Sequence, residues 1–195
     1  MTGAPGDPLP DQRVRIRTRP SADLTASEIT VIRDLLRRAF GDDEDERFGD
    51  EDWEHALGGR HVVVEVDGRI VGHAAIVPRS LEIGRSPLRT GYVEAVAIDP
   101  SLHGRGLGSR LMSVVDADIR DSFELGALGT GRHAFYERLG WRTWLGPSSV
   151  RSPDGERRTP DEDGFIIVLP TPSTPPGLLD LTLPISCDWR AGDVW

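Results

Sequence analysis

The stretch GYVEAVAIDPSLHGRGLGSRLM, residues 91–112, decides the fold of this chain. Residues 91–98 are apolar apart from one tyrosine and Glu94, which is the pattern of a largely buried strand. A turn with three glycines follows, and after it Leu107, Leu111 and Met112 recur at helical spacing. The sequence therefore predicts a strand, a tight turn and a helix in succession. The first turn of such a helix suits a pyrophosphate, because it offers free N–H groups and the positive end of the helix dipole.

Regular elements are also predicted on both sides of this stretch. Residues 13–18 alternate between polar and apolar side chains, as a strand does, and residues 25–28 read Thr-Ala-Ser-Glu, a capping box that opens a helix. Residues 61–66 and 69–77 form a predicted hairpin around Asp67 and Gly68. Further strands are expected at 123–128, 141–144, 165–169 and about 178–187, with a helix at 132–139. This mixture predicts an α+β (mixed α/β) fold, in which helices pack on a sheet.

The domain organisation follows from changes in composition along the chain. Residues 1–11 are rich in proline and glycine and are expected to form a flexible N-terminal leader. Residues 12–195 fit one domain, since a chain of this length buries a core of its own. A proline-rich connector begins a C-terminal extension, residues 170–195, that ends in CDWRAGDVW. Two tryptophans are unusual in a tail, because chain ends are normally frayed and polar.

Composition excludes several classes of protein. The longest apolar run, residues 165–169, is far too short to cross a bilayer, and the first residues contain no apolar signal-peptide core. The single cysteine, Cys187, rules out an internal disulfide and indicates a reducing compartment, so we expect a cytoplasmic protein without membrane contact. A net charge of −9 argues against a nucleic-acid partner.

The basic and metal-ligating residues narrow the chemistry further. All 23 basic residues are arginines, so neither Schiff-base lysine chemistry nor a Walker-type phosphate loop is available. The five histidines show no ligand spacing, and no metal site is predicted. They are His55, His61, His73, His103 and His133.

A second motif, HAFYERLGW at residues 133–141, makes the first one specific. In order and spacing, the two together resemble the GCN5-related N-acetyltransferases (GNAT). In that family an (Arg/Gln)-x-x-Gly-x-(Gly/Ala) turn precedes a later helix with the pattern Phe-Tyr-x-x-x-Gly-(Phe/Trp). The resemblance implies a central, mostly antiparallel twisted sheet, flanked by helices and splayed at the acetyl-coenzyme A (acetyl-CoA) site. It also implies direct attack of an amine on the thioester in a ternary complex, with acetyl-CoA as co-substrate.

The same resemblance assigns the residues that bind acetyl-CoA. The pantetheine is expected to pair, like a strand, with Val96 and Ile98. The pyrophosphate is expected on the amides of the turn formed by His103, Gly104, Arg105, Gly106, Leu107 and Gly108. His103 departs from the family, which usually has Arg or Gln there, and this departure predicts the loss of one charge contact.

Two side chains are candidates for acid–base chemistry. Glu94 lies on an otherwise apolar strand, and because an isolated buried carboxylate is costly, we expect it to line a cavity as general base, directly or through a water. The alternative is a structural carboxylate paired with an arginine. Tyr136, by its place in the family's pattern, is the expected general acid for the coenzyme A thiolate. Its alternative is a core tyrosine with a satisfied hydroxyl.

The choice of amine depends on an acidic loop and on the tail. Residues 42–52 carry eight carboxylates and one arginine, as in a solvated loop or a surface for a polycation. From about residue 25 to the end, the segments DWEHALGG (52–59), GYVE (91–94), LGAL (125–128) and CDWRAGDVW (187–195) resemble the aminoglycoside 2′-N-acetyltransferases. That resemblance implies that the amines of the drug bind Asp43, Asp52, Glu94, Asp193 and the terminal carboxylate of Trp195. The loop around Asp43 is longer than the family's.

Other interpretations fit the same residues. The Trp195 ring is alternatively a plug for a core or a dimer contact, and Asp188 and Arg190 are expected to be structural. The first rival function is acetylation of another amine: a polyamine, a kasugamycin-like antibiotic or a protein N-terminus. A peptide needs an open groove, whereas an acidic pocket closed by the tail favours a compact cation. The second rival is a non-catalytic module that binds coenzyme A. A homodimer is expected, because similar enzymes commonly form one.

Overall fold

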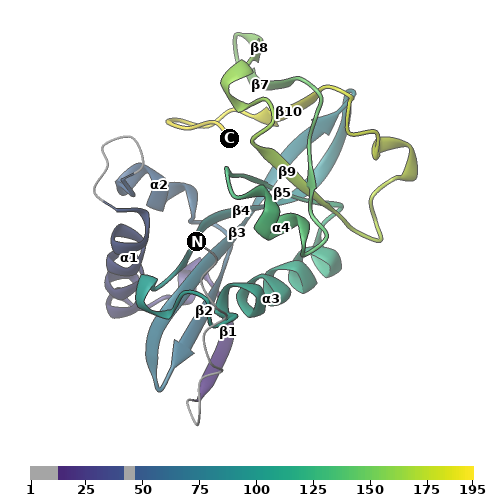
Figure 1. Ribbon diagram of the computed structural model, residues 1–195. Helices are drawn as coiled ribbons and strands as arrows, with labels where there is room; N and C mark the ends of the chain where they lie inside the picture. The colour runs from purple at the N-terminus through teal and green to yellow at the C-terminus, as the bar shows by residue number, and fades with distance from the viewer. Residues whose placement is uncertain (1–12, 42–46) are drawn as a thin grey trace. The chain divides into compact units, whose positions relative to one another are not determined.

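The computed structural model describes residues 13–41 and 47–195 (Figure 1). The predicted leader, residues 1–11, and the predicted substrate carboxylate Asp43 lie outside the described residues. The chain divides into two compact units, Met1–Ile76 with Glu94–Val115 and Val77–Val93 with Asp116–Trp195. Strands β3 and β4 and helix α3 belong to both units, because the chain passes through each of them on its way from one unit to the other.

The first unit is built on antiparallel strands. β1 (Val14–Pro20) pairs with β2 (Arg60–Val66), and β2 pairs with the first part of β3 (Arg69–Ile83), where Arg60 lies opposite Ile76. Asp67 and Gly68 join β2 to β3 with φ of 49° and 79°. These are the two left-handed residues that a type I′ turn requires, so the predicted hairpin is confirmed.

Helix α1 (Ala26–Phe40) begins at the predicted capping box. Thr25 Oγ1 accepts the Glu28 N–H at 3.2 Å, and the Glu28 carboxylate accepts the Thr25 N–H at 2.9 Å. The fully buried face of α1 consists of Ile32, Leu35 and Leu36. A shorter helix, α2 (Asp50–His55), follows, and Trp53 is its buried residue.

The strand, turn and helix predicted for residues 91–112 are confirmed. Strand β4 (Ser86–Ile98) is followed by the short helix η2 (Pro100–Leu102), by the glycine-rich turn and by helix α3 (Leu107–Ser122). Residues 94–98 of β4 and the first part of α3 belong to the first unit. Leu107, Leu111 and Met112 are buried, as their helical spacing predicts.

The second unit carries most of the strands. They are β5 (Leu125–Gly129), β6 (Arg142–Thr143), β7 (Ser148–Ser152), β8 (Gly155–Arg158), β9 (Ile166–Pro170) and β10 (Ile185–Asp188). Together with residues 77–83 of β3 and 86–93 of β4, they follow the order β6-β9-β5-β4-β3-β10-β7-β8. β4 with β5 and β7 with β10 pair in parallel, whereas β3–β10, β5–β9, β6–β9 and β7–β8 are antiparallel. The predicted α+β fold with a mostly antiparallel sheet is confirmed.

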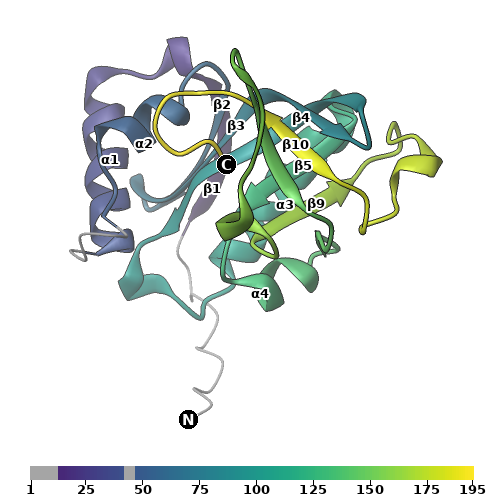
Figure 2. The same ribbon diagram turned by 90° about the horizontal axis from the view of Figure 1, so that it is seen from above.

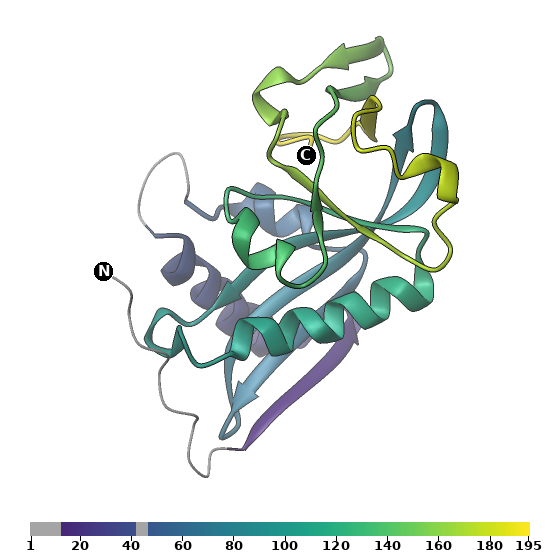
Figure 3. The ribbon, with the colours of Figure 1, turned by 45° about the vertical axis from the view of Figure 1, so that its right-hand side comes forward.

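The second unit differs from the sequence analysis at two places. The hairpin of β7 and β8 was not predicted, although Pro153, Asp154 and Gly155 are typical turn residues; it is visible in Figure 3. The last strand, expected at about 178–187, is the shorter β10. Asp180 explains the difference, because its Oδ1 accepts both the N–H and the hydroxyl of Thr182, at 3.0 and 2.7 Å, and so forms a turn where a strand was expected.

Candidate active site

Strand β4 is irregular at the candidate base. Glu94, Ala95 and Val96 are partly exposed, between the buried residues Val93 and Ala97. Ala95 has a φ of 52°, a left-handed conformation that costs a residue with a β-carbon roughly 1–2 kcal/mol and interrupts the alternation of the strand. Irregularities of this kind re-aim side chains and peptide groups beside active sites. The partial exposure of Glu94 agrees with a carboxylate that lines a cavity.

The glycine-rich turn before α3 presents open backbone. Gly104 and Gly106 have φ of 77° and 75°, and a β-carbon added at either would meet no atom within 4 Å. The first N–H groups of α3 have no partner within the helix, so the turn fits an approaching pyrophosphate. His103 is held by two bonds: its N–H donates to the Pro100 carbonyl at 3.3 Å, and its ring Nε2 donates to the Ile98 carbonyl at 2.9 Å. The histidine that departs from the family pattern thus closes the turn onto the end of β4.

Tyr136, the candidate acid, lies on α4 (His133–Glu137) in the second unit. It is 6% exposed and packs edge-on against Trp141, with ring centroids 6.0 Å apart. Burial raises the pKa of Tyr136 to about 12, while Arg132 lowers it and Asp116 raises it by smaller amounts. The phenol therefore keeps its proton at neutral pH, as a hydrogen-bond donor to a leaving thiolate must.

The tail leaves β10 as a loop (Figure 2) and is anchored by its last residue. Trp195 is 4% exposed within the apolar core of the second unit, and its ring Nε1 donates to Thr159 Oγ1 at 2.9 Å. Its terminal oxygen accepts from Arg190 Nη2 at 2.8 Å, and its N–H donates to Asp193 Oδ1 at 3.1 Å. The Trp195 ring thus fills a position in the core. The structural role expected of Arg190 is confirmed, because Arg190 holds the chain end.

A second arginine, Arg79, is buried and supports the start of the tail. The Arg79 side chain is 3% exposed, and its Nε donates to Asp188 Oδ1 at 3.2 Å, which confirms the structural role expected of Asp188. The guanidinium of Arg79 lies 4.9 Å from the centre of the Tyr92 ring, and that of Arg190 lies 5.7 Å from the same centre. Both arginines are therefore held by cation–π contacts as well as by hydrogen bonds.

An acidic pair that the sequence analysis missed lies beside the tail. Burial raises the pKa of Glu162, and the neighbouring charges of Asp193 and Asp161 raise it further. Glu162 belongs to helix η3 (Pro160–Glu162), which follows β8, so it meets Asp193 only through the folding of the second unit. The sequence signal for Glu162 is the acidic run of residues 161–163. A carboxylate crowded by other carboxylates, as Glu162 is, favours a bound cation, because a positive charge relieves the repulsion.

Asp52, a predicted substrate carboxylate, caps a helix in the structure. Its Oδ2 accepts the Gly49 N–H at 2.7 Å, at the N-terminus of α2. The first turn of that helix consists of Asp50, Glu51 and Asp52, and negative charge is favourable there because of the helix dipole. Asp52 is partly exposed, so one of its oxygens is committed to the cap while the carboxylate still borders solvent.

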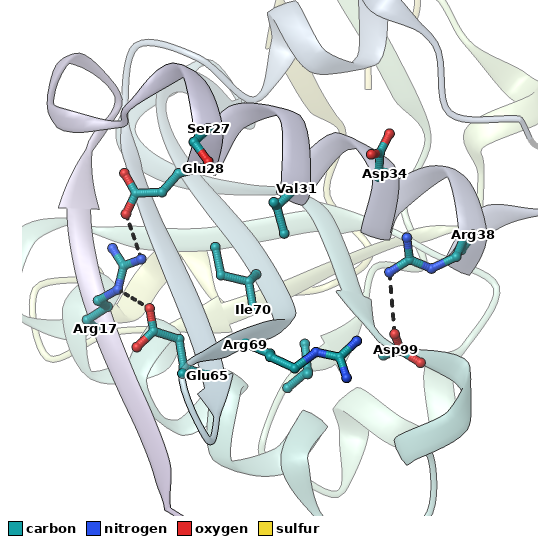
Figure 4. A pocket seen from close by; sticks show the side chains of 12 residues that line it. Arg17, Ser27, Glu28, Val31, Asp34, Arg38, Glu65, Arg69, Ile70 and Asp99 are labelled. Carbon is teal, nitrogen blue, oxygen red and sulfur yellow. Dashed lines mark hydrogen bonds and ion pairs between the residues drawn. The ribbon is translucent and has the colours of Figure 1, made fainter.

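A cavity of about 610 Å³ in the first unit contains none of the predicted site residues (Figure 4). Arg17 lies there between Glu28 and Glu65, at 2.7 and 2.8 Å, and Arg38 pairs with Asp99 at 3.4 Å. Because these arginines are matched by carboxylates, the cavity has the character of a salt-bridge network.

The described part of the chain lacks two kinds of feature. No group of three or more His, Cys, Asp or Glu side chains among residues 13–41 and 47–195 is arranged to hold a metal ion. Over the same residues, no helix is both long enough and apolar enough to span a membrane.

The comparisons with known proteins agree with the fold and with both motifs. Residues 22–144 match the family described as the acetyltransferase (GNAT) domain. A GNAT-family N-acetyltransferase of Escherichia coli (YhbS), whose structure is in complex with CoA, aligns with a TM-score of 0.64 over 93% of each chain at 19% identity. A GCN5-related N-acetyltransferase of Kribbella flavida aligns with a TM-score of 0.57 and 23% identity over 70% of this chain, which spans only 34% of that longer protein. The chain belongs to the GNAT acetyltransferase family.

A curated relative narrows the resemblance within that family. The chain is 42% identical, over 178 residues, to an aminoglycoside 2′-N-acetyltransferase of Mycolicibacterium fortuitum. The alignment covers 90% of this chain and 89% of the relative. The sequence resemblance to the aminoglycoside 2′-N-acetyltransferases is thereby confirmed.

Proposed function

We propose that this chain transfers the acetyl group of acetyl-CoA to the 2′-amine of aminoglycosides. The observation that carries the proposal is the 42% identity over 90% of the chain to an aminoglycoside 2′-N-acetyltransferase. The acidic pair of Glu162 and Asp193 supports it, since a polyamine drug offers several ammonium groups to such carboxylates. The open turn before α3 supports acetyl-CoA as the donor, with Val96 and Ile98 along its pantetheine.

The reaction begins with deprotonation of the amine. An ammonium has no lone pair, so a base must remove one proton, and Glu94 is the proposed base. The amine nitrogen then attacks the thioester carbon, a C–N bond forms, and the C–S bond breaks with the electron pair leaving on sulfur. The products are the acetylated drug and coenzyme A.

Tyr136 is proposed to stabilise the leaving thiolate. Burial raises the pKa of its phenol to about 12, whereas a free thiol has a pKa of about 8.5. Full proton transfer to a solvated thiolate would therefore be uphill by about 5 kcal/mol. Donation of a hydrogen bond during C–S cleavage does not carry that cost. We therefore propose that Tyr136 first donates a hydrogen bond to the sulfur. It gives up its proton only when the thiolate loses its contact with water.

Substrate recognition is proposed to combine carboxylates with the anchored tail. Asp193, Glu162 and Asp52 supply negative charge for the drug's ammonium groups. The terminal carboxylate of Trp195 is shared with Arg190, so its attraction for an amine is partly offset. Residues 170–195 thus act as a substrate-binding extension of the acetyltransferase domain.

The test is release of coenzyme A thiol from acetyl-CoA, measured with aminoglycosides that have or lack a free 2′-amine. Turnover confined to the members with that amine is the expected result. Equal turnover regardless of the group would keep the acetyltransferase and overturn the position. Acetyl-CoA binding without turnover on any member would favour another amine or a binding module.

A further inference from the structure

Two buried histidines of the first unit form a hydrogen-bonded row that ends on β4. Ser21 Oγ lies 2.9 Å from His61 Nε2, His61 Nδ1 lies 2.8 Å from His73 Nε2, and His73 Nδ1 lies 2.8 Å from the Ala95 carbonyl oxygen. Both imidazoles are completely buried. Trp53 packs on both, with ring centroids 5.6 Å from His61 and 6.2 Å from His73.

The Ala95 carbonyl, at which the row ends, determines which ring nitrogens carry a hydrogen. A carbonyl only accepts, so His73 Nδ1 carries a hydrogen and donates it to Ala95. Burial lowers the pKa of His73 to about 3 and that of His61 to about 4, so both rings are neutral at pH 7. Nε2 of His73 is then an acceptor and His61 Nδ1 donates to it, which leaves His61 Nε2 as an acceptor. The Ser21 hydroxyl has one hydrogen and lies 2.9 Å from His61 Nε2 and 3.1 Å from the Gly59 carbonyl oxygen, so these two acceptors share it. Both rings are Nδ1–H tautomers.

This row orients a peptide group and does not conduct protons. Its last member is a carbonyl, which has no proton to pass on. The carbonyl belongs to Ala95, the residue with a φ of 52°, whose strained conformation needs an external contact to persist. In a planar trans peptide the N–H points opposite to the C=O. With the Ala95 oxygen held toward His73, the Val96 N–H points away from that ring.

We propose that His61 and His73 are positioning residues that fix the peptide between Ala95 and Val96, so that the Val96 N–H is aimed at the thioester oxygen of the acetyl donor. The inference builds on the proposed function, in which the donor lies along Val96. A fixed N–H there stabilises the negative charge that develops on the thioester oxygen during attack. Loss of one such donor typically costs about 10²–10³ in rate, and misalignment costs part of that.

Three substitutions of His73 separate donation to Ala95 from simple filling of space. In His73→Asn the amide nitrogen takes the place of Nδ1 and still donates to the Ala95 carbonyl. In His73→Gln the amide nitrogen lies farther out, where Nε2 was, and His73→Leu has no donor. The expected order of kcat is wild type, then Asn within about threefold, then Gln and Leu lower by at least tenfold. Leu35→Ala on α1, a buried residue of the same unit outside the histidine row, is the control for lost stability, with an unchanged kcat.

A binding measurement isolates the acetyl oxygen. Acetyl-CoA and CoA differ in the acetyl group, so calorimetric Kd values for His73→Leu should change for acetyl-CoA more than for CoA. An equal change in both, or a kcat for Leu equal to that for Asn, would overturn the proposal. A wild type that binds neither ligand, or transfers acetyl to no amine, would instead overturn the proposed function.

The tautomers are read in the native protein, independently of any variant. Long-range ¹H–¹⁵N spectra of the imidazoles should show Nδ1–H for both His61 and His73, with no protonation between pH 6 and 8. An Nε2–H tautomer of His73 would leave the Ala95 carbonyl without its donor and would overturn the proposal, even if no His73 variant folds.

Discussion

Tyr136 and Asp116 are buried titratable side chains of the same unit, and burial raises the pKa of both, to about 12 and about 6. For the phenol, the consequence is a retained proton at neutral pH. The Asp116 carboxyl, in contrast, is ionised at neutral pH although it is buried. The hydrogen bond from Trp141 Nε1 at 3.1 Å offsets part of the cost of burying that charge. The raised pKa of Tyr136 suits its proposed role as a donor, whereas the raised pKa of Asp116 lowers the stability of the folded protein at neutral pH.

Tyr136→Phe is expected to lower kcat by roughly 10²-fold, because the ring keeps its contacts with Trp141 while the donor to the thiolate is lost. The Kd of acetyl-CoA should stay within about twofold of wild type, because in the proposed mechanism the acid acts only as sulfur departs. Steady-state kinetics at saturating drug, with calorimetry for acetyl-CoA, checks both. An unchanged kcat would remove Tyr136 from the mechanism.

Asp116→Asn is expected to stabilise the protein above pH 6. The folded pKa of Asp116, about 6, lies above the ordinary aspartate value of 3.8, so the folded state holds its proton to higher pH and stability falls as pH rises from about 4 to about 6. Asparagine keeps an acceptor for Trp141 and carries no charge. Urea unfolding should show a gain of up to about 3 kcal/mol at pH 7.5 that shrinks toward pH 4. A gain independent of pH would contradict this account.

At the scale of elements, the main feature of the tail is that contacts of its last residue hold it in place. β10 lies between β3 and β7, and the chain after it is fixed by the Trp195 ring on Thr159 and by Arg190 on the terminal oxygen. Asp193 is thereby held near Glu162 of η3. A carboxylate on a chain end can serve the proposed substrate site well only if the end is ordered beforehand, because ordering on binding costs conformational entropy.

Deleting Trp195 is expected to raise the KM of the drug by at least tenfold and to leave the Kd of acetyl-CoA unchanged. The deletion removes the ring from the core and moves the terminal carboxylate. Trp195→Phe is the matched variant, because it keeps the carboxylate and an aromatic ring while losing the bond to Thr159. Its KM should lie between wild type and the deletion. Equal KM values for all three would show that the tail does not bind substrate.

At the scale of the whole chain, the net charge of −9 is expected to act in opposite directions on acetyl-CoA and on the proposed aminoglycoside. A polycationic drug is attracted by the excess of carboxylates, and a phosphate-rich donor is repelled by it. These long-range effects weaken when salt shortens the Debye length, whereas contacts within a closed site weaken less.

The KM of the aminoglycoside is therefore expected to rise roughly tenfold when NaCl is raised from about 0.05 to about 0.5 M, while the KM of acetyl-CoA falls or stays constant. Initial rates with each substrate varied separately give both values. A neutral osmolyte at matched osmolality is the control. An equal rise in both KM values would point to a general loss of activity in salt.

The sequence by itself determined the elements with local causes. The capping box at Thr25, the left-handed turn at Asp67 and Gly68, and the strand, turn and helix of residues 91–112 are fixed by hydrogen bonds and φ preferences among near neighbours. The two motifs also determined the family, because they require particular residues at fixed spacing.

Only the tertiary structure decided which distant residues meet. Glu162 lies near Asp193, Arg190 holds the chain end, and His73 donates to Ala95 through strand pairing that no local pattern encodes. The strand missed at β7 takes its shape from β8 and β10, the neighbours with which it pairs. The strand overextended before β10 has a local cause instead, the turn that Asp180 forms with Thr182. The physical reason is range: caps and turns involve neighbours along the chain, whereas pairing, burial and pKa shifts depend on the packed whole.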